Sequence, residues 1–119
     1  MADSKTYPGG CHCGKVRFEA TTALGQVIAC NCSICVKRGL WLTFVRPEQF
    51  RLLAGEGELQ DYRFNKRVIQ HLFCPTCGVE AFARGKTKDG GDMLAVNVRC
   101  LDGVDIATLA PKPFDGRSL

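Results

Sequence analysis

Long apolar segments are absent from this sequence of 119 residues. No stretch approaches the roughly 20 consecutive apolar residues that a membrane-spanning helix needs. The opening residues MADSKTYPGG also lack the apolar core of a secretory signal peptide. The first absence argues against a membrane span, and the second makes the cytoplasm the expected location. The length is that of one domain.

Concentrated positive charge is also scarce. The net charge is +4, but the 16 lysines and arginines are spread along the chain, and none of their runs exceeds two residues. A nucleic-acid-binding surface usually carries a denser basic stripe. We therefore expect neither a nucleic-acid partner nor a membrane partner, although the positive charge would attract a small anionic substrate.

Helical periodicity is missing as well, because no segment of ten or more residues has apolar positions that repeat every 3.6 residues. Short stretches of alternating or branched apolar residues instead predict strands over residues 16–20, 40–45, 50–53, 59–64, 68–73, 79–83 and 93–98. Turns are expected at residues 47–49 and 88–92. The predicted fold is mainly β, a sandwich or related layered sheet with few or no long helices.

The two ends of the chain carry weaker signals. Residues 1–8 are expected to form a flexible tail, and residues 9–119 a single domain without an internal linker. The last ten residues, APKPFDGRSL, contain two prolines, which predicts an irregular path over the surface.

Cysteine, by contrast, is abundant. The eight cysteines fall into three groups and one isolated residue: Cys11-His12-Cys13-Gly14, Cys30-Asn31-Cys32-Ser33-Ile34-Cys35, Cys74-Pro75-Thr76-Cys77-Gly78, and Cys100. The cytoplasm keeps thiols reduced, so clustered cysteines there indicate metal binding or redox chemistry. A disulfide framework would suit a secreted chain instead.

The first and third groups each supply a pair of ligands that can converge on one metal ion. Cys11 and Cys13 are separated by one residue, and in an extended chain such residues point to the same side. Cys74 and Cys77 form a Cys-x-x-Cys turn followed by Gly78, which can adopt a positive φ. Two such pairs complete a tetrahedral zinc site. We therefore predict a structural zinc bound by Cys11, Cys13, Cys74 and Cys77.

The middle group supplies only three thiolates, from Cys30, Cys32 and Cys35. Three protein ligands with an exchangeable fourth position form the pattern of catalytic zinc, and a bound zinc ion keeps a coordinating thiol deprotonated. These three cysteines are therefore the predicted catalytic residues, acting through a second zinc that an outside thiol can reach. Completion of the site by Cys100 or by a histidine would make it structural instead.

Other interpretations of these residues are weaker. The segment Cys74–Cys77 also resembles a redox dithiol, but such dithiols begin a helix, whereas the flanks here are predicted strands. The spacings match no ferredoxin-type iron–sulfur run. Cys100 is expected to be a buried free thiol. By alternation His12 should point away from the metal, and His71 could lie in the core or on the surface.

The motifs GGCHCGKVRF, CNCSIC and FCPTCG, in this order, with NVRCLD at residues 97–102, resemble the glutathione-dependent formaldehyde-activating enzyme family, also called the centromere protein V family. The resemblance implies a β-tent fold of packed antiparallel sheets around a structural zinc. It assigns that zinc to the first and third cysteine groups and a second zinc to the middle group. In the name-giving members the second zinc is linked with glutathione and with its addition to formaldehyde, which gives S-hydroxymethylglutathione. Members are commonly grouped as carbon–sulfur lyases.

This chain is shorter than expected for the name-giving enzymes. Glutathione needs cationic partners for its two carboxylates, and the sequence does not single them out among the candidates Lys37, Arg38, Arg67 and Arg99. We predict a zinc-dependent carbon–sulfur lyase-type enzyme that binds a thiol such as glutathione for adduct chemistry with formaldehyde or another small aldehyde. The alternative is a non-catalytic, zinc-stabilised β scaffold that binds a protein or nucleic-acid partner. A methionine-sulfoxide reductase of related fold would need Cys100 as its reactive thiol.

Overall fold

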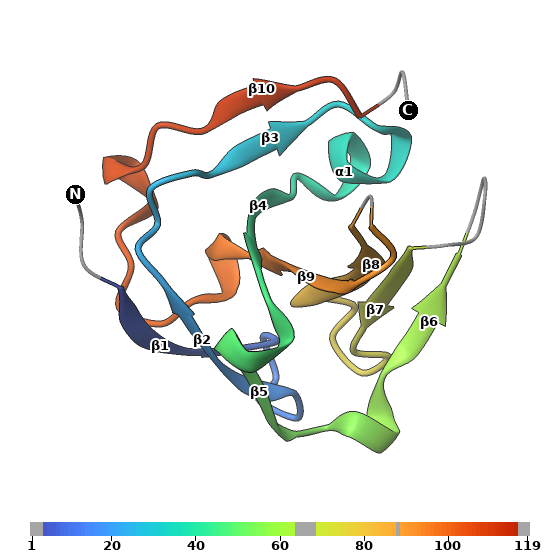
Figure 1. Ribbon diagram of the computed structural model, residues 1–119. Coiled ribbons are helices and arrows are strands. Elements are labelled where there is room, and N and C mark those ends of the chain that lie inside the picture. The colour runs from blue at the N-terminus through green and yellow to red at the C-terminus, as the bar shows by residue number, and fades with distance from the viewer. Residues whose placement is uncertain (1–3, 64–68, 88, 117–119) are drawn as a thin grey trace.

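The computed structural model describes residues 4–63, 69–87 and 89–116, which form a mainly β structure of two packed sheets (Figure 1). One sheet has three strands in the order β1-β2-β5, and the other has seven in the order β10-β3-β4-β9-β8-β7-β6. The strands are β1 (Lys5–Gly10), β2 (Arg17–Thr22), β3 (Ile28–Cys30), β4 (Trp41–Val45), β5 (Phe50–Ala54), β6 (Gln60–Tyr62), β7 (Gln70–Phe73), β8 (Phe82–Lys86), β9 (Asp92–Asn97) and β10 (Lys112–Phe114).

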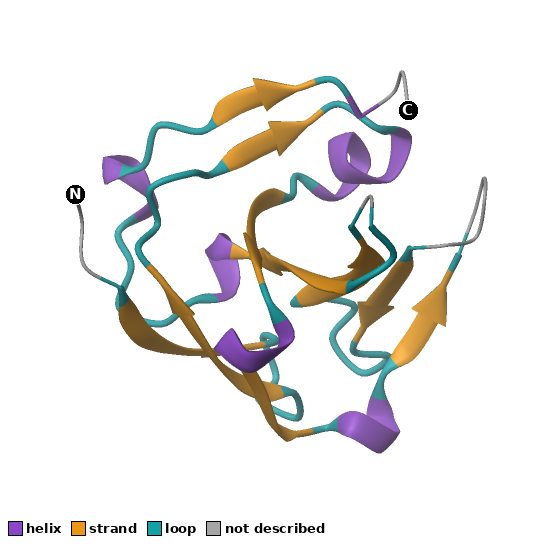
Figure 2. Ribbon diagram, viewed as in Figure 1, coloured by secondary structure: helices purple, strands orange, loops and turns teal. Residues whose placement is uncertain are grey.

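Helical structure is limited to short segments between strands (Figure 2). The one α-helix of the described residues, α1 (Ser33–Arg38), has six residues. The 3-10 helices are η1 (Pro47–Gln49), η2 (Glu56–Glu58), η3 (Val98–Cys100) and η4 (Ile106–Thr108). The expected mainly β class with packed antiparallel sheets is therefore confirmed. None of the helices in the described ranges has the length and apolarity needed to cross a membrane.

The core between the sheets is built on three phenylalanines. Phe18 lies on β2 and Phe50 on β5, with ring centroids 5.2 Å apart, and Phe82 of the larger sheet lies 4.7 Å from Phe50. Phe18 and Phe82 are fully buried. Aromatic side chains bury more apolar surface than other residues, so this cluster joins the two sheets. Cys11 and Cys74 belong to the same core.

The flexible tail expected over residues 1–8 is wrong for residues 5–8, and residues 1–3 lie outside the described part. β1 pairs with β2 in antiparallel register from Lys5 opposite Thr22 to Gly10 opposite Arg17. Pro8 obscured this strand, but an edge strand tolerates proline because one side of its backbone needs no partner. Gly9 lies so close to its neighbours that a Cβ atom there would be 2.6 Å from the carbonyl oxygen of Cys100.

The irregular path expected for the last ten residues is also wrong for Lys112–Phe114. This segment forms β10 and pairs with β3 in the parallel direction, whereas the other strand pairs of the described residues are antiparallel. β10 is again an edge strand, and it contains Pro113. Proline content therefore misled the prediction at both ends for the same reason.

The internal strands follow the prediction with shifts at their ends. The strand expected over residues 79–83 begins only at Phe82 and extends to Lys86, because residues 74–79 belong to the cysteine turn. β6 and β7 are shorter than expected, and the predicted residues 64 and 68 lie outside the described part of the chain. In the turn expected at residues 88–92, the Gly90 N–H donates to the Thr87 carbonyl at 3.0 Å, and Lys88 is not described.

The substitution Phe82→Ala should lower the free energy of unfolding by about 3–5 kcal/mol, because it leaves a cavity between the two sheets. Chemical denaturation would measure this loss. Phe44→Ala is the matched control, since Phe44 is 40% exposed, and it should destabilise far less. Equal losses for the two variants would contradict the assigned core.

Candidate metal centres

The sulfur atoms of Cys11, Cys13, Cys74 and Cys77 lie within 4.8 Å of one another. The Sγ atoms of Cys11 and Cys13 are 3.6 Å apart, as are those of Cys13 and Cys74. Tetrahedral coordination with a Zn–S distance near 2.3 Å places neighbouring sulfurs roughly 3.8 Å apart. All four thiols are free, so no disulfide competes for them. The donor set and its spacing therefore fit one zinc ion, or a similar soft metal, enclosed by sulfur.

Two similar backbone turns produce this first cluster. The Cys11 N–H donates to the carbonyl oxygen of Val16 at 3.1 Å, and the Cys74 N–H donates to that of Val79 at the same distance. Each turn contains a glycine with positive φ, Gly14 at 86° and Gly78 at 81°, and this conformation strains other residues. The first turn follows β1 of the small sheet, and the second follows β7 of the large sheet. A metal bound here would link the two sheets.

Backbone N–H groups near the first cluster stabilise the thiolate form of some of its cysteines. Desolvation opposes ionisation of Cys77, but N–H groups of Cys13 and Val79 and the neighbouring thiols outweigh it and lower the pKa of Cys77 to about 6. The Lys15 N–H favours the Cys13 thiolate, but desolvation and the neighbouring thiols raise the pKa of Cys13 to about 11. Four adjacent thiols therefore do not all ionise together without a cation, which a divalent metal would supply.

The second cluster consists of Cys30, Cys32 and Cys35, whose sulfur atoms also lie within 4.8 Å of one another. Cys30 ends β3, Cys32 precedes the first residue of α1, and Cys35 lies within that helix. The Cys32 N–H points to the Cys30 sulfur at 3.4 Å. Cys35 is buried, whereas Cys30 and Cys32 are half-buried. The short strand-to-helix connection thus turns three sulfurs toward one point and leaves two of them in contact with solvent.

Among the described residues, no fourth cysteine, histidine, aspartate or glutamate joins this second cluster. Closure of the site by Cys100 or by His12 or His71 therefore has no support. Desolvation raises the pKa of Cys35 well above its ordinary value. For Cys32 the N–H groups of Cys35 and Ile34, together with the neighbouring thiols, outweigh desolvation and lower the pKa. The arrangement can hold a metal ion through three sulfurs and expose one face of it.

Cys100 lies near the first cluster rather than the second. Desolvation, with the negative charges of Cys11 and Cys77 nearby, raises its pKa to about 12. Its sulfur is 4.0 Å from the carbonyl oxygen of Glu80. A half-buried thiol with a raised pKa is a poor nucleophile, so Cys100 does not resemble the reactive residue that a methionine-sulfoxide reductase needs.

A buried ionic group joins the segments that carry the two clusters, and sequence reasoning missed it. Glu80, three residues after Cys77, is 3% exposed. One carboxylate oxygen pairs with the Arg38 guanidinium on α1, and the other lies 3.0 Å from Nδ1 of His71. The Asn97 side-chain amide donates to the Glu80 backbone carbonyl at 3.0 Å. Because Glu80 alternates with apolar residues in the sequence, nothing in the local pattern distinguished it from a solvent-facing side chain.

The four candidate cations for the substrate carboxylates have different surroundings. Arg38 is engaged by Glu80, and the Arg99 guanidinium lies 4.2 Å from the centre of the Trp41 ring. Arg67 lies outside the described residues. Lys37 is exposed in the last turn of α1 and forms no ion pair with another described residue.

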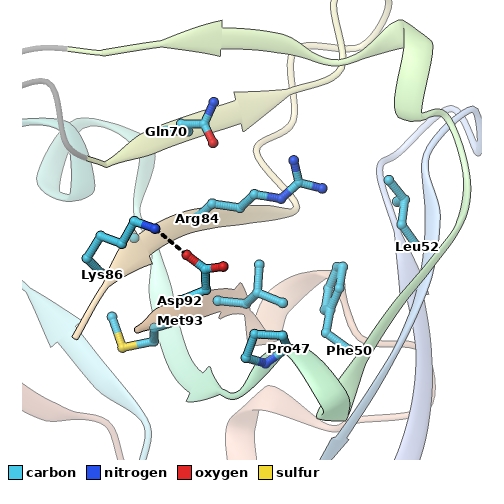
Figure 3. Close-up of a pocket in the computed structure, with 10 residues that line it drawn as sticks. Pro47, Phe50, Leu52, Gln70, Arg84, Lys86, Asp92 and Met93 are labelled. Atoms are coloured by element: carbon cyan, nitrogen blue, oxygen red, sulfur yellow. Dashed lines mark hydrogen bonds and ion pairs between the residues drawn. The ribbon is translucent and has the colours of Figure 1, made fainter. Parts of the chain in front are cut away.

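A hollow of about 500 Å³ lies between the two sheets, on the face of the large sheet opposite the second cysteine cluster (Figure 3). Arg84 of β8 and Leu94 of β9 line it, together with Phe50 of β5. Their strand neighbours Ala83 and Ala95 pack instead against the residues around Cys35, and side chains alternate between faces along a strand. This hollow is therefore separated by the sheet from the second cysteine cluster.

Comparison with known proteins places these features in a family. Residues 6–113 match the model of the family described as glutathione-dependent formaldehyde-activating enzyme. The chain is also similar to a Rhodobacter sphaeroides protein of known crystal structure, with a TM-score of 0.79 and 31% sequence identity. That similarity covers 89% of this chain and 97% of the other.

The substitution Cys77→Ser should abolish cooperative folding, because metal bound at a structural site contributes directly to folding free energy. Far-UV circular dichroism and zinc content per chain would measure the effect. Cys32→Ser should retain the fold and lose only the second metal. Cys100→Ser is the matched control outside both clusters and should keep both metals. A folded Cys77→Ser protein would contradict a structural role for the first cluster.

Glu80→Gln should destabilise the protein by an amount at the lower end of the about 3–5 kcal/mol typical for breaking a buried ion pair, because Arg38 remains partly exposed. Denaturant unfolding would measure it. The exposed pair Arg46–Glu48 provides the control, and Glu48→Gln should change stability by about 1 kcal/mol or less. A comparable effect of the two substitutions would show that the Glu80 pair is not an important contact.

Proposed function

Because the chain belongs to the family of glutathione-dependent formaldehyde-activating enzymes, we propose that it is a zinc-dependent enzyme of the carbon–sulfur lyase type. It binds a thiol such as glutathione at Cys30, Cys32 and Cys35 and promotes adduct formation with formaldehyde or another small aldehyde. The observation that carries the proposal is the second cluster, in which three sulfurs converge and two of them remain half-exposed.

The reaction balances without an oxidant or a reductant. The thiol sulfur attacks the aldehyde carbon, an S–C bond forms, the C=O π bond opens, and the proton of the thiol ends on the new hydroxyl oxygen. Zinc bound by the three cysteines would supply a Lewis acid that holds the incoming sulfur as a thiolate. No histidine or carboxylate of the described residues lies within the cluster, so water is the expected carrier of the proton.

Several residues of the chain would contribute to this reaction through their charge or by holding a metal ion. Cys30, Cys32 and Cys35 bring three negative charges, so the site with one divalent ion has a net charge of about −1 and favours a soft sulfur ligand over a further hard anion. Lys37, exposed in the last turn of the helix that carries Cys35, would attract a carboxylate of the thiol substrate. The first cluster, with Cys11, Cys13, Cys74 and Cys77, would hold the other zinc ion, which would have a structural role. These functions require reduced thiols, as in the cytoplasm.

Calorimetric titration of the zinc-loaded protein with glutathione should show one zinc-dependent binding event. Cys32→Ser should reduce the heat to that of the buffer control, because the second metal is lost. Cys100→Ser should bind glutathione as the native protein does.

If the native protein with two bound zinc ions gave no heat with glutathione or another small thiol, the enzyme proposal would be wrong. The non-catalytic scaffold would then be the better interpretation. If Cys100→Ser alone lost thiol-dependent activity, chemistry at Cys100 would be indicated instead.

A further inference from the structure

The C-terminal segment of the described chain lies against the second cysteine cluster. β10 runs beside β3, and Phe114 lies opposite Cys30 in the parallel register (Figure 1). The Asn31 N–H donates to the Phe114 carbonyl oxygen at 3.0 Å. The Asn31 side-chain amide also donates to the Asp115 carboxylate at 3.0 Å. Backbone and side-chain hydrogen bonds thus hold residues 112–115 next to the strand that ends at Cys30.

Gly116 continues this segment directly over the cluster. A Cβ atom at Gly116 would lie 2.5 Å from the Cys30 sulfur and 3.4 Å from the Cys32 Cβ atom. Non-bonded carbon atoms prefer separations of about 3.5–4.0 Å, so the first distance leaves no room for even a methyl group. By contrast, a Cβ atom at Gly57 would meet no atom within 4 Å.

We propose that residues 112–116 form one wall of the three-cysteine site, and that Gly116 is a positioning residue that acts through Cys30. This inference rests on the proposed function, because it assumes a metal held by the three sulfurs. A sulfur bound to a metal ion cannot move away without weakening that bond. A side chain at position 116 must therefore either displace the wall or pull Cys30 from the metal.

The wall also decides from which side a thiol can approach. β10 and Gly116 cover the Cys30 side, and the core residues Leu40 and Leu42 pack with the buried Cys35. Cys32, which precedes the first residue of α1, is half-buried and remains partly open to solvent. Residues 114–116 lie beyond residue 113, where the family match ends. Gly116 and its contact with Cys30 are therefore features of this chain outside the matched residues.

The test compares Gly116→Ala with Gly57→Ala, a matched control in open space. Both proteins would be loaded with zinc, and transfer of zinc to a chromophoric chelator would be followed over time. We expect two kinetic phases for the native protein and the control. In Gly116→Ala the phase assigned to the second cluster should be about tenfold faster or more, since overpacking displaces a ligand, while the first-cluster phase should stay unchanged. Cys32→Ser should lack one of the two phases, and this loss identifies the phase that belongs to the second cluster.

Asp115→Ala provides a second variant that loosens the wall without adding bulk. It should speed release from the second cluster by a few-fold, in keeping with the loss of one hydrogen bond, and it should increase the alkylation rate of Cys30 measured by mass spectrometry. Unchanged zinc release in both variants would overturn the wall proposal. Altered release without any glutathione binding by the native protein would uphold the wall and overturn the proposed enzyme function instead.

Discussion

The convergence of four thiols from two sheets is the constraint on which the rest of this structure depends. Cys11 and Cys13 follow a strand of the small sheet, and Cys74 and Cys77 follow a strand of the large sheet. A protein of this size has a modest core, and here three phenylalanines provide much of the contact between the sheets. A metal ion bound by the four sulfurs would fix the two sheets at the edge of that core.

The second cluster inherits its geometry from this arrangement. The turn after Cys77 leads to Glu80, and its buried carboxylate holds Arg38 at the end of α1. On the other side β10 pairs with β3, so Cys30 is held by the strand that carries it and by its neighbour. The three thiols, two of them half-buried, are therefore held by contacts with Glu80 through α1 and with the C-terminal strand β10. Preorganisation of this kind is what a reactive metal site requires.

The two clusters share sulfur ligands but differ in how completely those ligands would enclose a metal ion. Four sulfurs saturate a tetrahedral ion and leave no position for an outside ligand, whereas three sulfurs leave one. The hollow between the sheets, with Arg84 and Leu94 at its wall, lies across the sheet from the second cluster. A thiol would therefore reach the second cluster from its solvent-exposed side, where Cys32 is half-buried, and not through that hollow.

The sequence alone determined the composition of both clusters and the mainly β class, because these depend on local spacing. Cys-x-Cys and Cys-x-x-Cys converge by their own backbone geometry, and alternating strands show their period directly. Only the tertiary structure decided that Pro8 and Pro113 lie in edge strands, that Glu80 is buried against Arg38 and His71, and that Gly116 touches Cys30. Each of these depends on contacts between residues far apart in the chain, for which no local pattern exists.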